Sequence, residues 1–236
     1  MRVLAVVHEP DAGPGVFAQS IEEAGGELEQ WLIAAGEPSP VDPLAVDALI
    51  TLGGAMHPDQ EADHPWIGEE KRLLAELIDR GMPLLGVCLG AELLASAAGG
   101  EVARAPQPEV GWYRVQTTHA GGDDPLLAPL APEFEALEWH SYSFGLPPGG
   151  TALARSEAGL QAFRVGARAW GIQFHAEATL RDFESWLDHY RDDDDAVGMG
   201  LDPDALRAQT RASIGEWNAL GRELCAQFLD VARRLC

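Results

Sequence analysis

The sequence predicts an α/β fold in which one mixed, mostly parallel sheet carries helices on both faces and is followed by a helical C-terminal extension. In the first hundred residues, short apolar runs alternate with segments of helical spacing, which is typical of parallel strands joined by helices. The 236 residues are 46% hydrophobic and 23% charged, so the chain can bury a sizeable core. Since no internal repeat or low-complexity linker interrupts the sequence, we expect one domain.

In the first half of the chain, short apolar runs predict strands, apolar residues at helical spacing predict helices, and glycines mark where helices end. Phe17 and Ile21 are four residues apart and mark the first helix, and Gly81 ends the second. The predicted strands are Val3–Val7, Leu28–Ile33, Ala48–Leu52 and Pro83–Val87, and the predicted helices are Val16–Ala24, Trp66–Arg80 and Leu89–Ala98.

The middle of the chain has strand-like runs with turn residues between them and little helix, which predicts an antiparallel or mixed extension of the sheet. From Glu177 onward the spacing is helical again, with Asp192–Asp195 expected as a solvated loop and Leu201–Leu235 as one or two helices. The middle strands are predicted at Trp112–Thr118, Phe134–Trp139, Ala152–Arg155, Leu160–Val165 and Ala169–Phe174.

Charge and composition exclude several classes of function. The formal net charge of −22 argues against nucleic acid or an anionic membrane surface as a partner. Lys71, the one lysine, follows Glu70 rather than glycine, so the chain lacks a P-loop for ATP. The N-terminal apolar run is too short for a signal peptide, and we expect a cytoplasmic protein.

Few residues suggest a metal or a disulfide. The three cysteines, Cys88, Cys225 and Cys236, are too scattered for a disulfide framework or a zinc cluster. We expect Cys225 and Cys236 to be packing or incidental thiols. The loop that holds His57, Asp59, Asp63 and His64 contains proline and matches no usual zinc spacing. The sequence therefore predicts no metal and no cofactor.

Gly86-Val87-Cys88-Leu89-Gly90 follows a predicted strand and opens a predicted helix. This is the arrangement of a nucleophile elbow with cysteine as the nucleophile, in which the glycines leave room for a sharp turn. The positive end of the helix favours a thiolate at this position. The alternative is a buried structural cysteine. Because a base with an orienting acid is also present, the catalytic interpretation of Cys88 is favoured.

His175 and Glu177 end the apolar run Gly171–Phe174. A thiol nucleophile needs a base, and the base needs a partner that orients it. His175 can accept the thiol proton and pass it to a leaving amine, while Glu177 holds the imidazole. Taken alone, the histidine would be a hydrogen-bonded core residue and the glutamate a surface charge.

Three stretches in this order resemble class I glutamine amidotransferases, in particular the stand-alone relatives of the amidotransferase domain of GMP synthase. They are TLGGAMHPD (Thr51–Asp59), GVCLGAELLA (Gly86–Ala95) and GIQFHAE (Gly171–Glu177). The resemblance implies a flavodoxin-like sheet. It also implies an amidotransferase domain over residues 1–185 and a helical extension over residues 186–236 that packs on the same domain.

The resemblance further implies hydrolysis of a γ-glutamyl amide, with glutamine as the usual donor. Cys88 would attack the carboxamide and leave a γ-glutamyl thioester. The backbone N–H groups of Leu89 and Gly54 would form the oxyanion hole, and Gly53 would let the backbone approach the substrate. Segments with His140 and Glu109 border the pocket in such relatives.

Two positions depart from the family pattern. Ala176 stands where proline is common between the histidine and the glutamate. Glu92 stands where many relatives carry a glutamine that contacts the donor. Four residues separate Glu92 from Cys88, so both lie on one helix face. Glu92 would bind the α-ammonium group of the substrate, or it is a salt-bridged helix residue.

Three functions remain open. The first is a glutaminase that supplies ammonia to a separate ATP-using synthetase. The second is a self-sufficient hydrolase or peptidase acting on a γ-glutamyl conjugate. The third is a non-catalytic binding protein of the same fold, against which the intact Cys88, His175 and Glu177 count. The sequence also leaves open whether the helices after Glu177 form a homodimer interface or pack within one chain.

Overall fold

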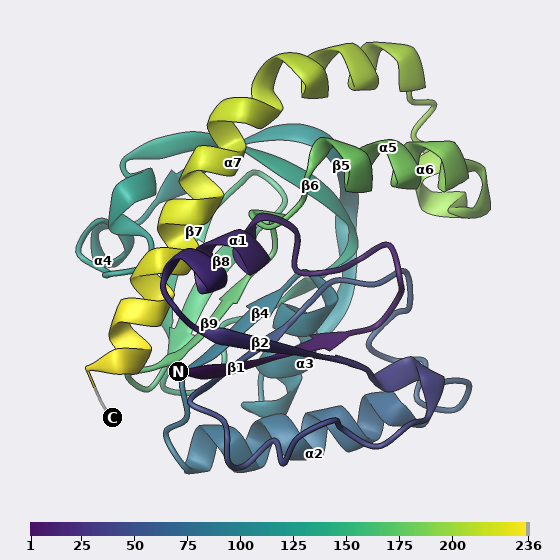
Figure 1. The fold of residues 1–236 in the computed structure, drawn as a ribbon. Helices are drawn as coiled ribbons and strands as arrows, with labels where there is room; N and C mark the ends of the chain where they lie inside the picture. The colour runs from purple at the N-terminus through teal and green to yellow at the C-terminus, as the bar shows by residue number, and fades with distance from the viewer. Residues whose placement is uncertain (235–236) are drawn as a thin grey trace.

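The computed structural model describes residues 1–234 and contains one mixed nine-stranded sheet with the strand order β2-β1-β3-β4-β9-β8-β7-β5-β6 (Figure 1). The pairings from β2 to β9 are parallel, and those from β9 to β6 are antiparallel. The predicted α/β fold with a mixed sheet is confirmed, although the sheet has four parallel and four antiparallel pairings and is thus not mostly parallel. Its parallel half ends at the two strands that carry Cys88 and His175 at their carboxyl ends.

The elements alternate as expected over the first hundred residues. The strands are β1 (Arg2–Val7), β2 (Glu27–Leu32), β3 (Ala48–Thr51), β4 (Leu84–Val87), β5 (Val102–Thr117), β6 (Glu133–Phe144), β7 (Thr151–Arg155), β8 (Leu160–Val165) and β9 (Ala169–Ile172). The α-helices are α1 (Gly15–Glu23), α2 (Trp66–Asp79), α3 (Leu89–Ala97), α4 (His119–Gly122), α5 (Leu180–His189), α6 (Asp194–Gly198) and α7 (Pro203–Arg233). Short 3₁₀ turns cover Ile33–Ala35, Ala128–Leu130 and Tyr190–Asp192.

The core lies in two layers, one on each face of the sheet. In β1, Val3 and Ala5 face the layer covered by α1 and α7, whereas Leu4 and Val6 face the layer covered by α2 and α3. A strand with helices on both sides is apolar at successive positions, which explains the unbroken run at its sequence position. Helices thus cover both faces, as predicted.

The antiparallel half is longer than the sequence predicts. β5 begins at Val102, ten residues before the predicted start, and β6 continues past Trp139 to Phe144. The register between them shifts between Arg104 and Glu109, where Pro106 and Pro108 interrupt the backbone donors. The two prolines and the bulge interrupt the alternation of apolar and polar residues that predicts a strand.

The C-terminal region also differs from the expectation. The prediction of a solvated loop at Asp192–Asp195 is wrong in part: Asp192 ends a 3₁₀ turn, Asp193 caps α6, and α6 begins at Asp194. α7 is one continuous helix that lies beside α1 (Figure 1). The predicted domain boundary at residues 185 and 186 falls inside α5, and that division stays a prediction. No helix within residues 1–234 is long and apolar enough to cross a membrane.

Candidate active site

Cys88 sits on a strained turn between β4 and α3. Its φ of 50° makes it the sole non-glycine residue with positive φ within residues 1–234. The flanking glycines are required by space, since a Cβ on Gly86 would lie 2.6 Å from the carbonyl oxygen of Gly90. A Cβ on Gly90 would lie 2.2 Å from the carbonyl oxygen of Thr51. The predicted elbow is therefore present, and such strain concentrates at functional positions.

The structure brings Cys88, His175 and Glu177 together because β4 and β9 are parallel neighbours. His175 Nδ1 lies 2.8 Å from Glu177 Oε1, and its Nε2 is buried without a hydrogen-bond partner among the described residues. The Cys88 thiol donates to the carbonyl oxygen of Trp139 at 3.6 Å. A thiol that turns from this carbonyl would find Nε2 as its acceptor.

Cys88 and His175 shift each other's protonation. Burial alone would lower the pKa of His175, but Glu177 and Cys88 raise this pKa well above its usual range. Burial raises the pKa of the Cys88 thiol, and the charge of His175 opposes this shift. A thiolate at this position would form against a desolvation cost, and an imidazolium held by Glu177 would offset part of that cost.

The loop with Gly53 and Gly54 packs directly on these side chains. A Cβ on Gly53 would lie 2.9 Å from His175 Cε1, so only glycine fits without displacing the ring. Gly54 and Leu89 both line the cavity, and neither backbone N–H donates a hydrogen bond within residues 1–234. Two free N–H donors beside the thiol can stabilise a developing oxyanion.

A buried polar network that was not predicted from the sequence supports this loop. Both ring nitrogens of His8 face oxygen atoms: Nδ1 lies 3.1 Å from the Gly53 carbonyl oxygen, to which it donates, and Nε2 lies 2.8 Å from Glu70 Oε2. Thr51 donates to the other oxygen of Glu70 at 2.5 Å. Burial lowers the pKa of His8, but Glu70 outweighs it and the net pKa is raised. The sequence feature that could have indicated this network is a histidine directly after β1, at the same edge of the sheet as Cys88.

Glu92 projects from the first turn of α3 into the same cavity and is 3% exposed. Gln173 Nε2 donates to Glu92 Oε1 at 3.0 Å, and no ion pair to Glu92 occurs in the described part of the chain. Burial raises the pKa of Glu92 to about 8, against the opposing effect of the Gln173 hydrogen bond. Gln173 lies two residues before His175, and in an extended segment residues at this spacing point to the same side. The sequence could therefore have indicated Gln173 as a residue of the site.

His140 lines the cavity and forms a buried network with Glu109, which lies outside the lining. His140 Nε2 lies 3.0 Å from Glu109 Oε2 and 3.6 Å from Glu138, and its Nδ1 lies 2.7 Å from the Tyr142 carbonyl oxygen. His140, Glu109 and Glu138 are the candidate metal group among the described residues. Gln161 also donates to Glu109, so its carboxylate is already satisfied by protein donors. This favours a structural network over a metal centre.

His57, Asp59, Asp63 and His64 do not form a metal group in the described structure. His57 stacks on Tyr142, and Asp59 accepts a hydrogen bond from its hydroxyl group at 3.0 Å. Cys225 is fully buried, and burial raises its pKa to about 12. Cys236 lies outside the described residues.

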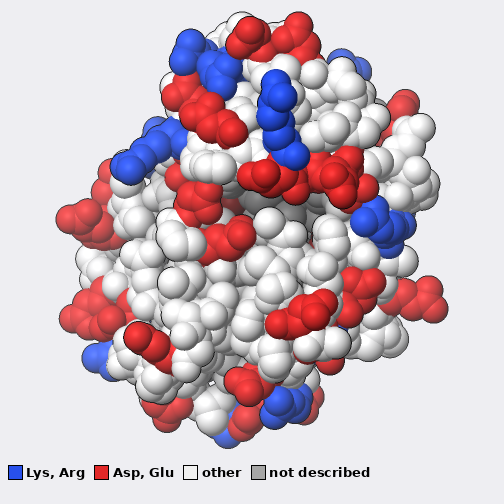
Figure 2. Space-filling view, turned by 90° about the vertical axis from the view of Figure 1, so that its right-hand side faces the viewer, with Lys and Arg blue, Asp and Glu red and all other residues white. Residues whose placement is uncertain are grey.

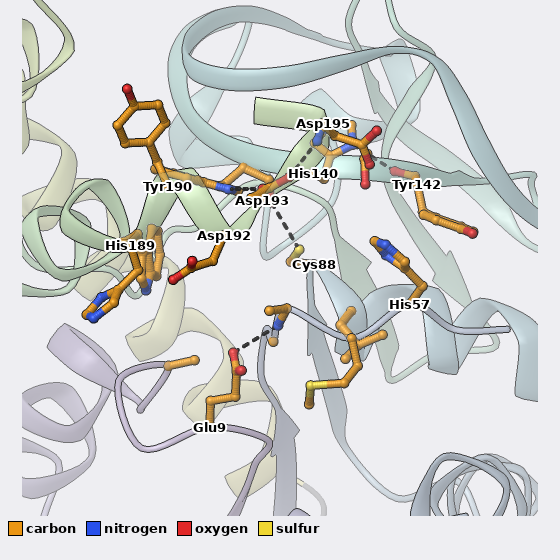
Figure 3. A pocket seen from close by; sticks show the side chains of 18 of the residues that line it. Glu9, His57, Cys88, His140, Tyr142, His189, Tyr190, Asp192, Asp193 and Asp195 are labelled. Atoms are coloured by element: carbon orange, nitrogen blue, oxygen red, sulfur yellow. Dashed lines mark hydrogen bonds between the residues drawn. The ribbon is translucent and has the colours of Figure 1, made fainter. Parts of the chain in front are cut away.

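The cavity has a volume of about 550 Å³ and opens between the loops after β1 and β3 and the segment from α5 to α6 (Figure 3). Trp186 of α5 lies against the His175 ring at 4.8 Å between ring centroids. Trp139 lines the same wall, and its indole N–H donates to Asp193 at 3.0 Å. In the space-filling view, acidic side chains surround a hollow (Figure 2). The sequence did not assign this aspartate run to the site.

α7 holds the loop that carries His175. Trp217 Nε1 donates to the carbonyl oxygen of His175 at 2.8 Å. A Cβ on Gly221 would lie 2.0 Å from the carbonyl oxygen of Ala176, so a larger residue would force the helix and the loop apart. Asn218 donates to the carbonyl oxygen of Ala178 at 2.8 Å. The backbone around Ala176 is therefore fixed by contacts from α7.

Fold and site together define an α/β protein with a cysteine elbow that faces a histidine on the neighbouring parallel strand. The family model described as "Glutamine amidotransferase class-I" matches residues 17–189, and the chain belongs to this family.

Named relatives agree with this assignment. The chain is 30% identical over 193 residues to the glutamine amidotransferase-like protein YfeJ of Salmonella typhimurium, covering 80% of this chain and 81% of that protein. It is 40% identical over 98 residues to a glutamine-hydrolysing GMP synthase subunit of Ignicoccus hospitalis, covering 40% of this chain and 50% of that protein. The crystal structure of a glutamine amidotransferase from Thermotoga maritima superposes with a TM-score of 0.87 at 27% identity, covering 98% of both chains.

Proposed function

We propose that this protein hydrolyses the γ-amide of glutamine through a cysteinyl γ-glutamyl thioester. The observation that carries the proposal is the arrangement of Cys88, His175 and Glu177, with His175 Nε2 buried, unpartnered among the described residues and lining the cavity. An acid-held imidazole beside a thiol is the arrangement that activates a cysteine nucleophile.

The steps follow from the positions of these groups. The Cys88 sulfur attacks the carboxamide carbon, and the oxyanion accepts hydrogen bonds from the N–H groups of Gly54 and Leu89. The C–N bond breaks as His175 passes a proton to the departing ammonia. Water then attacks the thioester with His175 as the base, releasing glutamate and the thiol. Glu92 binds the substrate α-ammonium group at the side of the cavity.

Such a site could serve either of two functions. Relatives named as glutamine-hydrolysing subunits of GMP synthase support delivery of ammonia to a separate synthetase. The cavity of about 550 Å³ supports a second function, hydrolysis of a larger γ-glutamyl conjugate by this chain alone. A volume within the ~300–1,000 Å³ typical of drug-sized ligands exceeds what one amino acid fills.

The test is glutamate release from glutamine by the purified chain, compared with Cys88→Ser, His175→Asn and, as a matched control, Cys225→Ser. We expect measurable turnover that falls by at least about a thousandfold in the first two variants and is retained in the third. Turnover that survives Cys88→Ser would refute the proposal. A complete lack of turnover on glutamine and on γ-glutamyl amides would refute it as well.

A further inference from the structure

The open side of the cavity is strongly acidic. Six carboxylates besides Glu92 line it: Glu9, Asp11, Asp192, Asp193, Asp194 and Asp195. They come from the loop after β1 and from the segment that runs from the end of the 3₁₀ turn at Tyr190–Asp192 into α6, so they stand on two sides of the opening. In the close-up, Glu9 and Asp192 lie on opposite sides of the space beside Cys88, and one oxygen of Glu9 accepts a hydrogen bond from the Ala55 N–H at 2.9 Å (Figure 3).

Positive charge at this opening is already neutralised. Arg104 is the one lysine or arginine among the described residues that line the cavity, and its Nη1 lies 2.8 and 2.9 Å from the two oxygens of Asp195. Asp192 and Asp194 form no hydrogen bond or ion pair through their side chains within residues 1–234, and both are exposed. Negative charges that line a cleft focus the electrostatic field there and attract a cation.

The inner end of the cavity indicates which part of a substrate would carry the positive charge. Cys88 and His175 Nε2 both line it, and Nε2 is buried without a partner in the described part of the chain. In the proposed reaction this nitrogen delivers a proton to the departing nitrogen, so the leaving group lies on the His175 side. The cavity continues from there to the acidic opening, where Trp186, His189 and Tyr190 complete the wall.

We propose that the physiological substrates are γ-glutamyl amides of a cationic amine, such as the mono-γ-glutamyl amide of an alkyl diamine. This inference rests on the proposed function and names its substrate class. The glutamyl part lies between Cys88 and Glu92, the alkyl chain runs past Trp186, and the terminal ammonium group meets Glu9, Asp192 and Asp194. Glutamine fills only the inner part of this cavity.

The reaction balances with water as the second reactant. The sulfur of Cys88 bonds to the γ-carbonyl carbon, the C–N bond breaks, and His175 protonates the departing amine nitrogen. Water cleaves the thioester, so the products are glutamate and the free amine. The distal ammonium group keeps its charge throughout and takes no part in the chemistry.

Three substrates of equal chain length test the proposal: γ-glutamyl amides of diaminobutane, pentylamine and aminobutyrate, whose far ends are cationic, neutral and anionic. Glutamate release is measured for each, and for glutamine, at low and high salt. We expect kcat/KM for the cationic amide to exceed that for the neutral amide by about tenfold or more at low salt, with the anionic amide lowest. The preference should shrink at high salt because exposed charges are screened.

Asp192→Asn and Asp194→Asn are each expected to reduce the ratio of cationic to neutral kcat/KM by about threefold, as loss of one exposed charge predicts. Asp79→Asn is the matched control: it removes the same charge from an exposed residue at the end of α2, outside the cavity lining, and should leave the ratio unchanged.

The outcomes separate the two proposals. Equal kcat/KM for the cationic and neutral amides, or hydrolysis of glutamine alone, would overturn the substrate class and leave the proposed glutaminase intact. A preference that Asp79→Asn reduces as much as Asp192→Asn would overturn the assignment to this opening. No hydrolysis of any of the four compounds would overturn the proposed function together with the inference.

Discussion

Replacing Glu92 by glutamine should stabilise the protein while weakening substrate binding. Glu92 is buried with one hydrogen bond from Gln173, and burial raises its pKa to about 8 from an ordinary 4.5. A glutamine at this position has nearly the same shape and keeps an oxygen to accept the Gln173 hydrogen bond. It differs in having no charge to desolvate, so the substitution isolates the cost of the carboxylate.

The sign and size follow from the pKa difference. Between pH 4.5 and 8 the folded state keeps the Glu92 proton that the unfolded chain releases, so this group lowers the free energy of unfolding as pH rises. Each pKa unit corresponds to about 1.4 kcal/mol, which amounts to about 3 kcal/mol at pH 7 and about 5 kcal/mol at pH 8 and above. Glu92→Gln should therefore gain stability over the wild type by amounts of this order, and the gain should vanish near pH 4.5.

Chemical denaturation of both proteins at a series of pH values from 5 to 8.5 measures this difference. Glu23→Gln, at an exposed position of α1, is the control and should show no pH-dependent gain. The KM for glutamine supplies the second readout. For the wild type it should fall by up to about tenfold per pH unit below pH 8, as the carboxylate that binds the α-ammonium group forms, and flatten above.

In Glu92→Gln the KM should be higher and nearly independent of pH over the same range, and Glu92→Ala should raise KM by more than about tenfold. A stability difference that is constant from pH 5 to 8.5 would refute the reasoning about burial. A wild-type KM without pH dependence, together with an unchanged KM in Glu92→Ala, would refute the binding role.

Three further predictions concern other parts of the site. A glutamine-analogue diazoketone should label Cys88 and spare Cys225, whose burial raises its pKa to about 12; peptide mapping that finds the label on Cys225 would contradict this. Gly221→Ala should cost about 1–3 kcal/mol of stability and lower kcat, because its Cβ would meet the loop beside His175, whereas Gly215→Ala on the same helix should be neutral or stabilising by up to about 1 kcal/mol. Glu70→Gln should lower kcat by about tenfold with little change in KM, since it breaks the support of the Gly53–Gly54 loop; an equal rise in KM would point to a general loss of structure.

The parallel half of the sheet and the elbow could be predicted because their signals are local. Val3–Val7 is a continuous apolar run and Ala48–Leu52 is interrupted only by Thr51, since helices cover both faces of their strands. Gly86 and Gly90 stand where a Cβ would strike backbone atoms within 2.6 Å, so these residue types are dictated by the turn itself. A geometric requirement of this kind leaves a readable trace in the sequence.

The rest depends on contacts between distant segments, which leave no such trace. Gln173 is paired with Glu92, 81 positions earlier in the chain, and nothing in either segment indicates the other. Asp192–Asp195 has the composition of a solvated loop, and only the path of α5 brings it over Cys88. The start of β5 could not be predicted because Pro106 and Pro108 lie within the strand.

The C-terminal helix α7 helps to hold the candidate active site in place, although the sequence predicts only a helical extension there. Ala176 stands where relatives commonly carry proline, so the backbone between His175 and Glu177 lacks that restriction of φ. Trp217 donates to the carbonyl oxygen of His175, and Gly221 lets the helix approach the carbonyl oxygen of Ala176. Contacts from the buried face of α7 thus constrain the loop that a proline ring would otherwise restrict. Because α7 also supplies core side chains such as Leu224 and Phe228, removing the whole helix would unfold this face of the sheet. Trp217→Phe removes the indole donor and keeps an aromatic ring, so it should lower kcat for glutamine more than it lowers the free energy of unfolding, and an unchanged kcat would contradict this role of the contact.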